Sequence, residues 1–177
     1  LQTCREHDID AIVAIGGDGT FRGATDLTNH GIPSIGIPAT IDNDITATDY
    51  TIGLDTSTNT TLRMIDNLKD TCESHARLNV VEVMGRDCGQ IALYAAIASS
   101  AVAVAIPEVP FDEDAAIQKI ANLRELGKRG MIVVVSEGRG AEFSEGLVKE
   151  IEAKTGIESR FVRPGHIVRG GIPTIAD

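Results

Sequence analysis

The stretch AIVAIGGDGT, residues 11–20, determines how the rest of the chain is interpreted. Its first five residues are apolar and largely β-branched, which is typical of a strand covered on both faces. The glycines that follow permit a sharp turn and let backbone N–H groups approach a phosphate. A strand followed by such a turn and a helix predicts an open α/β sheet, with ligands at the carboxyl ends of its strands.

Asp18 lies in this turn, where a carboxylate is well placed to hold Mg²⁺ beside a phosphate. We therefore predict that the glycine turn at residues 16–20 binds phosphate and that Asp18 supports the metal. A plain strand-to-helix turn capped by Asp18 is the alternative. The motif is moderately specific, because several kinase families with different acceptors carry it.

Apolar, β-branched runs recur along the chain with helical stretches between them. Further strands are predicted at residues 34–37, 80–84, 102–106 and 131–136, with a weaker one near 158–162. Helices are predicted at residues 55–69, 90–98, 112–126 and 143–154, and Asp112 is expected to cap the third of them. This alternation predicts an α/β fold of open, mostly parallel sheets with helices on both faces. An internal boundary is expected near Gly53, where a polar loop gives way to the longest helix.

The composition excludes several classes of protein. The 177 residues include 16 Lys and Arg against 26 Asp and Glu, a net charge of -10, so no general binder of nucleic acid or anionic membranes is expected. No apolar run reaches the ~20 residues that a membrane span needs. Three scattered cysteines are too few for a disulfide framework, which makes a reducing cytoplasm the expected location.

A second polar loop, PATIDND at residues 38–44, follows the next predicted strand. Its carboxylates, Asp42 and Asp44, are two residues apart and are flanked by Thr40 and Asn43. One carboxylate can accept the proton of an alcohol while the other orients it or reaches a metal through water. A capped turn is the alternative. The position of this loop, one βα unit after the glycine turn, favours a chemical role.

The two motifs together resemble the 6-phosphofructokinase family of the bacterial type. Further blocks similar to that family follow in its order, namely VMGR at 83–86, PE at 107–108, SE at 136–137 and GHIVRGG at 165–171. The resemblance covers essentially the whole chain and is very specific in combination. The opening strand, the Gly-rich nucleotide loop and the C-terminal end of the family have no counterpart here, so the chain is expected to be a fragment.

The resemblance implies two Rossmann-like lobes, of which the first is incomplete. Residues 1–53 would form part of the nucleotide-binding lobe and residues 54–165 the sugar-phosphate-binding lobe. Residues 166–177 would return toward the nucleotide lobe. The chain by itself is expected to be inactive, because half of the donor site is missing. The family also implies a homo-oligomer, a homotetramer, in which subunits share the sugar-phosphate site.

The activity that the resemblance implies is phosphoryl transfer from ATP, with Mg²⁺, to the 1-hydroxyl of fructose 6-phosphate. Asp42 would be the general base, and Arg86 would neutralise charge on the transferred group. Thr40 and Asp44 would complete the catalytic site. The cofactor-binding residues would be Gly17, Asp18, Gly19 and Thr20, with Asp18 as the metal ligand. The sugar phosphate would contact Thr40, Asp42, Met84, Gly85, Arg86, Glu137, His166 and Arg169, together with Arg77 and Arg160 of a neighbouring subunit.

Three of these residues also have an explanation that involves no ligand. Arg77 is also explained as a charge at a helix C-terminus, Glu137 as a loop cap and His166 as a structural histidine. An NAD kinase or a diacylglycerol-type lipid kinase would explain the glycine turn, but not residues 40–44 or 166–171. A non-catalytic regulatory subunit is a further alternative, although such subunits usually lose the base or the arginines.

Two residues bear on the phosphoryl donor. Pyrophosphate-dependent members of the family carry Asp where this chain has Gly19 and Lys where it has Ala39. A carboxylate at position 19 would occupy and repel the α-phosphate of ATP, so ATP is the expected donor. Ala39 differs from the Gly that is usual in ATP-dependent members. For this reason a pyrophosphate-dependent enzyme remains the alternative.

A further departure from the family concerns regulation. Bacterial members bind a nucleoside diphosphate effector through basic residues and a metal-linked glutamate. Val102 stands at the position of that glutamate, and its side chain cannot ligate Mg²⁺. Lys69 and Lys128 remain as phosphate contacts. Activation by ADP is therefore expected to be altered or absent.

Overall fold

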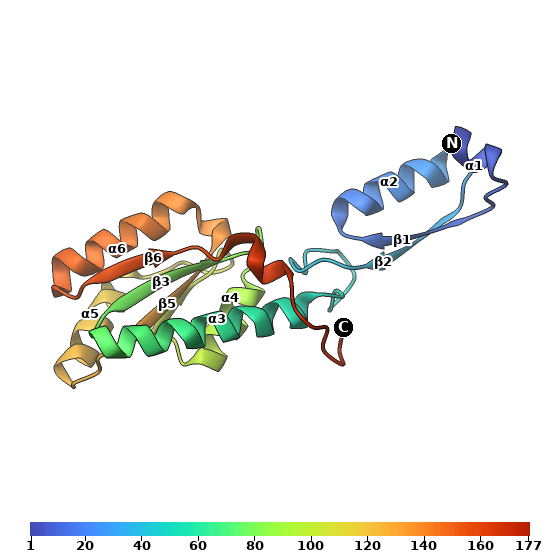
Figure 1. Ribbon diagram of the computed structural model, residues 1–177. Coiled ribbons are helices and arrows are strands. Elements are labelled where there is room, and N and C mark those ends of the chain that lie inside the picture. The colour runs from blue at the N-terminus through green and yellow to red at the C-terminus, as the bar shows by residue number, and fades with distance from the viewer.

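Two units joined by a polar loop make up the computed structural model, which describes every residue of the chain apart from the side chain of Ala141 (Figure 1). The small unit contains α1 (Gln2–Glu6), β1 (Ile12–Gly16), α2 (Asp18–Asn29) and β2 (Ser34–Pro38). The C-terminus lies beside the loop between the units, near the start of α3 (Leu54–His75).

The small unit is a two-stranded parallel sheet covered by one helix. β1 and β2 pair from Ile12 opposite Ser34 to Gly16 opposite Pro38. The ring of Phe21 on α2 packs so close to Gly36 that a Cβ there would lie 2.9 Å from it. The opposite face of the sheet carries exposed apolar side chains, those of Val13, Ile15 and Ile35.

The large unit is built on a four-stranded parallel sheet in the order β4-β5-β3-β6. Its elements after α3 are β3 (Leu78–Val83), α4 (Gln90–Ser99), β4 (Ala103–Ala105), α5 (Glu113–Glu125), β5 (Met131–Ser136), α6 (Ala141–Thr155) and β6 (Ser159–Val162). Two short 3₁₀ helices, η1 (Glu137–Arg139) and η2 (Gly165–Arg169), follow β5 and β6.

Helices cover both faces of this larger sheet. Val81 and Val83 of β3 point toward α3 and α4, where they pack with Ile65 and Ile91. Alternate residues of the same strand, Leu78 and Val80, point the other way and pack against α5 and α6. The central strands are therefore buried on both sides, which explains why their sequences are mostly apolar; the buried polar residues of β3 are Asn79 and Glu82. The predicted α/β class with parallel sheets is confirmed.

The predicted elements are present, with shifted ends. All six strands occur, although β4 is only three residues long. Asp112 caps α5 as predicted, because its Oδ1 accepts the Ala115 N–H at 2.9 Å. The helix predicted at 55–69 extends to His75, and α1 and the two 3₁₀ helices were not predicted. In the described chain, no helix is both long and apolar enough to span a membrane.

The C-terminal residue provides a cap that the sequence did not suggest. Gly53, the N-cap of α3, has no side chain to offer. The Asp177 carboxylate accepts hydrogen bonds from Gly53 N–H (2.9 Å), Thr56 N–H (2.8 Å) and the Thr56 hydroxyl (2.5 Å), and also from the Tyr50 hydroxyl. Burial raises the pKa of Asp177, but these hydrogen bonds outweigh burial and lower it to about 2. Residues 170–177 are thus fastened to the start of α3.

Candidate active site

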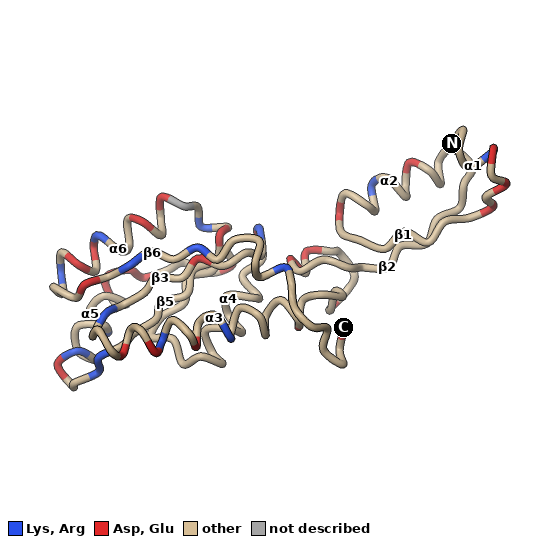
Figure 2. The backbone as a smooth tube through the Cα atoms, in the orientation of Figure 1, with Lys and Arg blue, Asp and Glu red and all other residues tan. Residues whose placement is uncertain are grey.

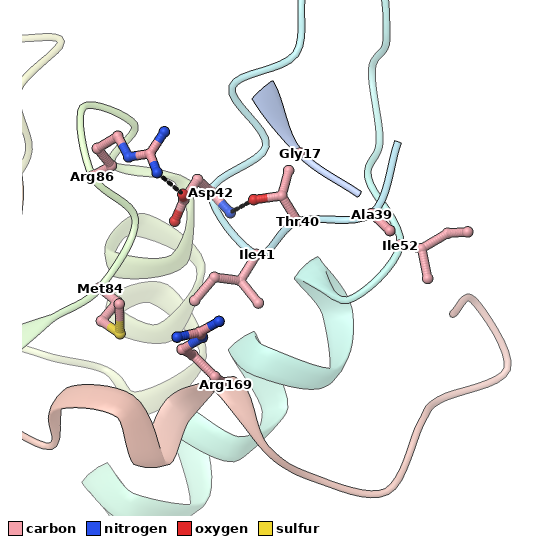
Figure 3. A pocket seen from close by; sticks show the side chains of 9 residues that line it. All are labelled: Gly17, Ala39, Thr40, Ile41, Asp42, Ile52, Met84, Arg86 and Arg169. Atoms are coloured by element: carbon pink, nitrogen blue, oxygen red, sulfur yellow. Dashed lines mark hydrogen bonds and ion pairs between the residues drawn. The ribbon is translucent and has the colours of Figure 1, made fainter. Parts of the chain in front are cut away.

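A cavity of about 440 Å³ lies where the carboxyl ends of β1 and β2 approach the carboxyl end of β3 (Figure 3). Its lining comes from both units and from η2. The lining residues are Gly17, Ala39, Thr40, Ile41, Asp42, Ile52, Met84, Arg86 and Arg169. Ligands of open α/β sheets bind at this edge, as the sequence predicted.

Asp42 and Asp44 of the small-unit loop face Arg86 of the large unit. The Arg86 Nη2 lies 3.6 Å from Asp42 Oδ2, and its Nη1 lies 3.1 Å from Asp44 Oδ2. The Asp42 side chain is only 13% exposed. Burial raises the pKa of Asp42, Arg86 lowers it, and the charges of Asp44 and Glu137 raise it again, so the net direction is upward. A carboxyl group with a raised pKa suits proton transfer near neutral pH.

Local hydrogen bonds hold the loop that carries Asp42. The Asp42 N–H donates to Thr40 Oγ1 at 3.2 Å. The Thr51 hydroxyl bonds the Thr40 carbonyl at 2.7 Å and Asn43 Oδ1 at 3.0 Å. Asn43 also reaches Gln90 on α4 at 2.5 Å, and it adopts a left-handed φ of 51° that Asn tolerates. The loop is therefore held both by its own hydrogen bonds and by the hydrogen bond from Asn43 to the large unit.

Glu137 fixes the backbone that presents Arg86. Its Oε1 accepts the N–H groups of Gly85 at 3.2 Å and Arg86 at 2.9 Å. Gly85 has φ 144°, and a Cβ there would lie 2.5 Å from the Cys88 carbonyl oxygen, so the position requires glycine. Arg86 itself is left-handed, with φ 51°. Such strain in a non-glycine residue is common at functional sites.

The glycine turn places α2 with its N-terminus toward the cavity. Gly17 is the N-cap of α2 and lines the cavity, and Thr20 packs on Gly16. A Cβ added at Gly19 would meet no atom within 4 Å, so there is open space at this position. Asp18 lies on the first turn of α2 and pairs with Arg22 at 2.8 Å. Within the described residues, no group of three or more His, Cys, Asp or Glu is arranged to hold a metal.

A second cavity, of about 210 Å³, adjoins the first on the large-unit side. Its lining includes Met84, Glu137, Arg163, Gly165 and His166. Met84 contributes to both cavities. The structure thus brings together most of the sequence-predicted residues in two adjoining spaces.

The comparisons with known proteins agree on one family. A family model described as Phosphofructokinase matches residues 1–177. The chain belongs to the phosphofructokinase family. It is 51% identical over 176 residues to the ATP-dependent 6-phosphofructokinase 1 of Clostridium perfringens, covering 99% of this chain and 54% of that protein. The chain therefore spans about half the length of the curated relatives that it matches.

Solved structures of this family share the fold. The phosphofructokinase of Saccharomyces cerevisiae superposes with a TM-score of 0.88 at 32% identity, covering 98% of this chain and 27% of that one. The pyrophosphate-dependent phosphofructokinase of Nitrosospira multiformis superposes with a TM-score of 0.77 at 23% identity, covering 95% and 48%. The second likeness concerns the fold alone.

The two arginines that the resemblance assigns to a neighbouring subunit's site line neither cavity of this chain. Arg77 and Arg160 both pair with Glu158 at the amino end of the large sheet, the first at 2.9 Å. The hydrogen bond from Arg77 is the main cause of the lowered pKa of Glu158. Both arginines therefore have a partner within the chain. Their contribution to a neighbouring subunit's site stays a prediction.

Other residues at the candidate site were missed by the sequence reasoning. Asn43 was noted only as part of a polar loop, yet it braces that loop on α4. Arg163 and Glu82 line the second cavity and form an ion pair at 2.6 Å. The available signal was Glu82 itself, a carboxylate within the apolar run 80–84.

Proposed function

We propose that the full-length protein is an ATP-dependent 6-phosphofructokinase that converts fructose 6-phosphate to fructose 1,6-bisphosphate. The observation that carries the proposal is the contact between Asp42 and Arg86 in the cavity of about 440 Å³. It places a largely buried base beside a cation at the carboxyl ends of the strands, as phosphoryl transfer to an alcohol requires. The names of the curated relatives support the same activity.

In this proposal Asp42 removes the proton of the sugar 1-hydroxyl. The hydroxyl oxygen forms a bond to the γ-phosphorus of ATP, and the bond from that phosphorus to the bridging oxygen breaks. ADP leaves with the electron pair. Arg86 stabilises the negative charge on the transferred group, which is usually the largest electrostatic effect in such a site. Thr40 and Asp44 hold the reacting groups in place.

ATP and Mg²⁺ would bind at the glycine turn through Gly17, Asp18, Gly19 and Thr20. Mg²⁺ in nucleotide sites is commonly held by one or two carboxylates plus the substrate phosphates, which fits the single carboxylate of Asp18. The exposed pair between Asp18 and Arg22 is weak enough to exchange. When bound, the ion would neutralise charge on the phosphates.

The open space at Gly19 supports ATP over pyrophosphate as the donor. A larger donor needs room beside the first turn of α2, and Gly19 leaves that room. Ala39 lines the cavity without adding a charge. The pyrophosphate-dependent alternative would need a cation near position 39 to hold the smaller product.

The sugar phosphate would extend from the cavity of about 440 Å³ into the cavity of about 210 Å³. Met84, Gly85 and Glu137 would contact the sugar, and His166 and Arg169 would hold the 6-phosphate. Arg77 and Arg160 would come from a neighbouring subunit of a homotetramer. Residues 1–53 and 166–177 would belong to the nucleotide lobe and residues 54–165 to the sugar-phosphate lobe. A cytoplasmic location suits a glycolytic enzyme.

The test is Asp42→Asn in the full-length protein, because this change keeps the shape and removes the base. Turnover of fructose 6-phosphate is expected to fall by orders of magnitude with the fold intact. Asp49→Asn is the matched control, since Asp49 is an exposed acid in the same loop that lines neither cavity. Near-normal turnover by Asp42→Asn would refute the mechanism.

A further inference from the structure

Arg163 and Glu82 form an ion pair at the carboxyl end of the large sheet. β3 and β6 pair up to Val81 opposite Val162, so Glu82 and Arg163 are the next residues along the two strands. The Arg163 Nε lies 2.6 Å from Glu82 Oε1, and the Ser144 hydroxyl of α6 donates to Glu82 Oε2 at 2.7 Å. Glu82 is only 4% exposed. Both of its carboxylate oxygens therefore have partners.

The buried carboxylate fixes the orientation of the guanidinium. A carboxylate in a core is costly unless it is paired and hydrogen-bonded, so Glu82 holds Arg163 strongly in one position. The hydrogen bond to Glu82 is also the main cause of the raised pKa of Arg163. A guanidinium has five N–H donors, and this contact uses the one on Nε. Among the described residues, the Nη groups have no hydrogen-bond acceptor, and the side chain is 46% exposed.

Arg163 faces the same spaces as Glu137. The two residues line the cavity of about 210 Å³ that also contains Met84 and His166. They also line a neighbouring cavity of about 510 Å³ that reaches Arg86. Glu137 uses Oε1 on two backbone N–H groups and keeps Oε2 for a further donor. A fixed donor and a fixed acceptor thus share the wall between two cavities.

A hydroxyl group fits this pair better than a phosphate does. A hydroxyl can accept from an Nη–H and donate to a carboxylate at the same time. Glu82 cancels the charge of Arg163, and Glu137 adds a negative charge that would repel a phosphate. The phosphate therefore belongs nearer His166 and Arg169, as proposed above.

We propose that Arg163 is a specificity-determining residue of the sugar site. Its Nη groups donate to one hydroxyl of the bound sugar phosphate, the same hydroxyl donates to Glu137, and Glu82 positions Arg163 for this contact. The inference rests on the proposed function and adds a residue to its substrate contacts. The arrangement gives the buried carboxylate of β3 a role at the site.

The test compares Arg163→Met with the double variant Glu82→Gln/Arg163→Met in the full-length protein. The double variant removes both charges, so it leaves no unpaired carboxylate in the core. Both variants should raise KM for fructose 6-phosphate roughly ten- to hundredfold, the effect of losing a hydrogen bond to a charged group. The kcat and the KM for ATP should stay within about twofold. Arg139→Met is the matched control, because Arg139 packs on Phe143 and lines neither cavity.

Fructose 6-phosphate analogues that lack the 3- or the 4-hydroxyl separate direct contact from a structural effect. One analogue should bind the unmodified protein weakly, and its affinity should fall no further in the Arg163 variants. An unchanged KM in the Arg163 variants overturns the inference. So does a raised KM if the loss from the Arg163 substitution adds in full to the loss from removing either sugar hydroxyl. Calorimetric binding of fructose 6-phosphate gives the same comparison without turnover. Failure of the unmodified protein to phosphorylate the sugar would refute the proposed function, whereas the calorimetric comparison would still decide the role of Arg163.

Discussion

Asp177→Asn is expected to destabilise the start of α3 and the loop next to it. The Asp177 carboxylate accepts hydrogen bonds from Gly53, from Thr56 and from Tyr50, whose neighbour Thr51 braces the loop that carries Asp42. An Asn side chain has the same shape but no charge, and its NH₂ group cannot accept from these donors. The change therefore weakens the hydrogen bonding between residue 177 and the segment next to the loop that carries Asp42.

The size of the effect follows from the pKa of Asp177. A fall from the ordinary 3.8 to about 2 corresponds to roughly 2 kcal/mol of stabilisation by the ionised form. Partial exposure to solvent reduces this figure to about 1–2 kcal/mol. Because the folded-state pKa is lowered, the stabilisation is complete above the ordinary pKa and is lost as the pH falls toward 2.

Urea unfolding of the full-length protein measures this difference. The free energy of unfolding of Asp177→Asn should be about 1–2 kcal/mol lower, equally so at pH 5 and pH 8, and the gap should narrow only below about pH 4. Asp66→Asn is the matched control, since Asp66 lies on the same helix in an exposed pair with Lys69 at 3.7 Å. The reasoning would be refuted if Asp177→Asn lowered the free energy of unfolding no more than Asp66→Asn does. It would also be refuted if the difference between Asp177→Asn and the unmodified protein grew as the pH falls.

Three further outcomes are expected of the full-length protein. Because burial raises the pKa of Asp42, kcat/KM should fall through one protonation at a pH above the ordinary Asp value; a pH–rate profile that is flat down to about pH 4 would contradict this. Gly19→Asp should depress kcat/KM for ATP steeply, and pyrophosphate outperforming ATP in the unmodified enzyme would overturn the donor assignment. Subunits with Arg160→Ala mixed with subunits carrying Asp42→Asn should regain activity if the site is shared, and verified mixed oligomers without activity would count against sharing.

The elements that were predicted correctly depend on short stretches of sequence. The strand at 131–136 and the Asp112 cap are determined by neighbouring residues, so periodicity and capping rules were sufficient to find them. The grouping of Asp42 with the glycine turn followed from the rule that parallel strands end at one edge of the sheet. The approach of Arg86 to Asp42 came from the family resemblance, not from spacing.

The features that were missed depend on residues far apart in the chain. Asp177 caps a helix whose N-cap is 124 residues away, and no local pattern connects the two. Arg77 and Arg160 meet at Glu158 only because β3 and β6 are neighbours in the sheet. Strand order was not predicted, and without it the partners of these arginines were not identifiable.

Glu82 shows that some long-range features do leave a local trace. A carboxylate flanked by Val81 and Val83 in a buried strand cannot be explained by packing, since burial without a partner would cost more than the strand gains. Such a residue needs hydrogen-bonding partners on adjacent elements, and Arg163 and Ser144 provide them here. In an open α/β sheet, a charge one residue before the carboxyl end also lies beside the ligand-binding edge. A buried acid at that position therefore points both to an arginine partner and to a role for that arginine at the site.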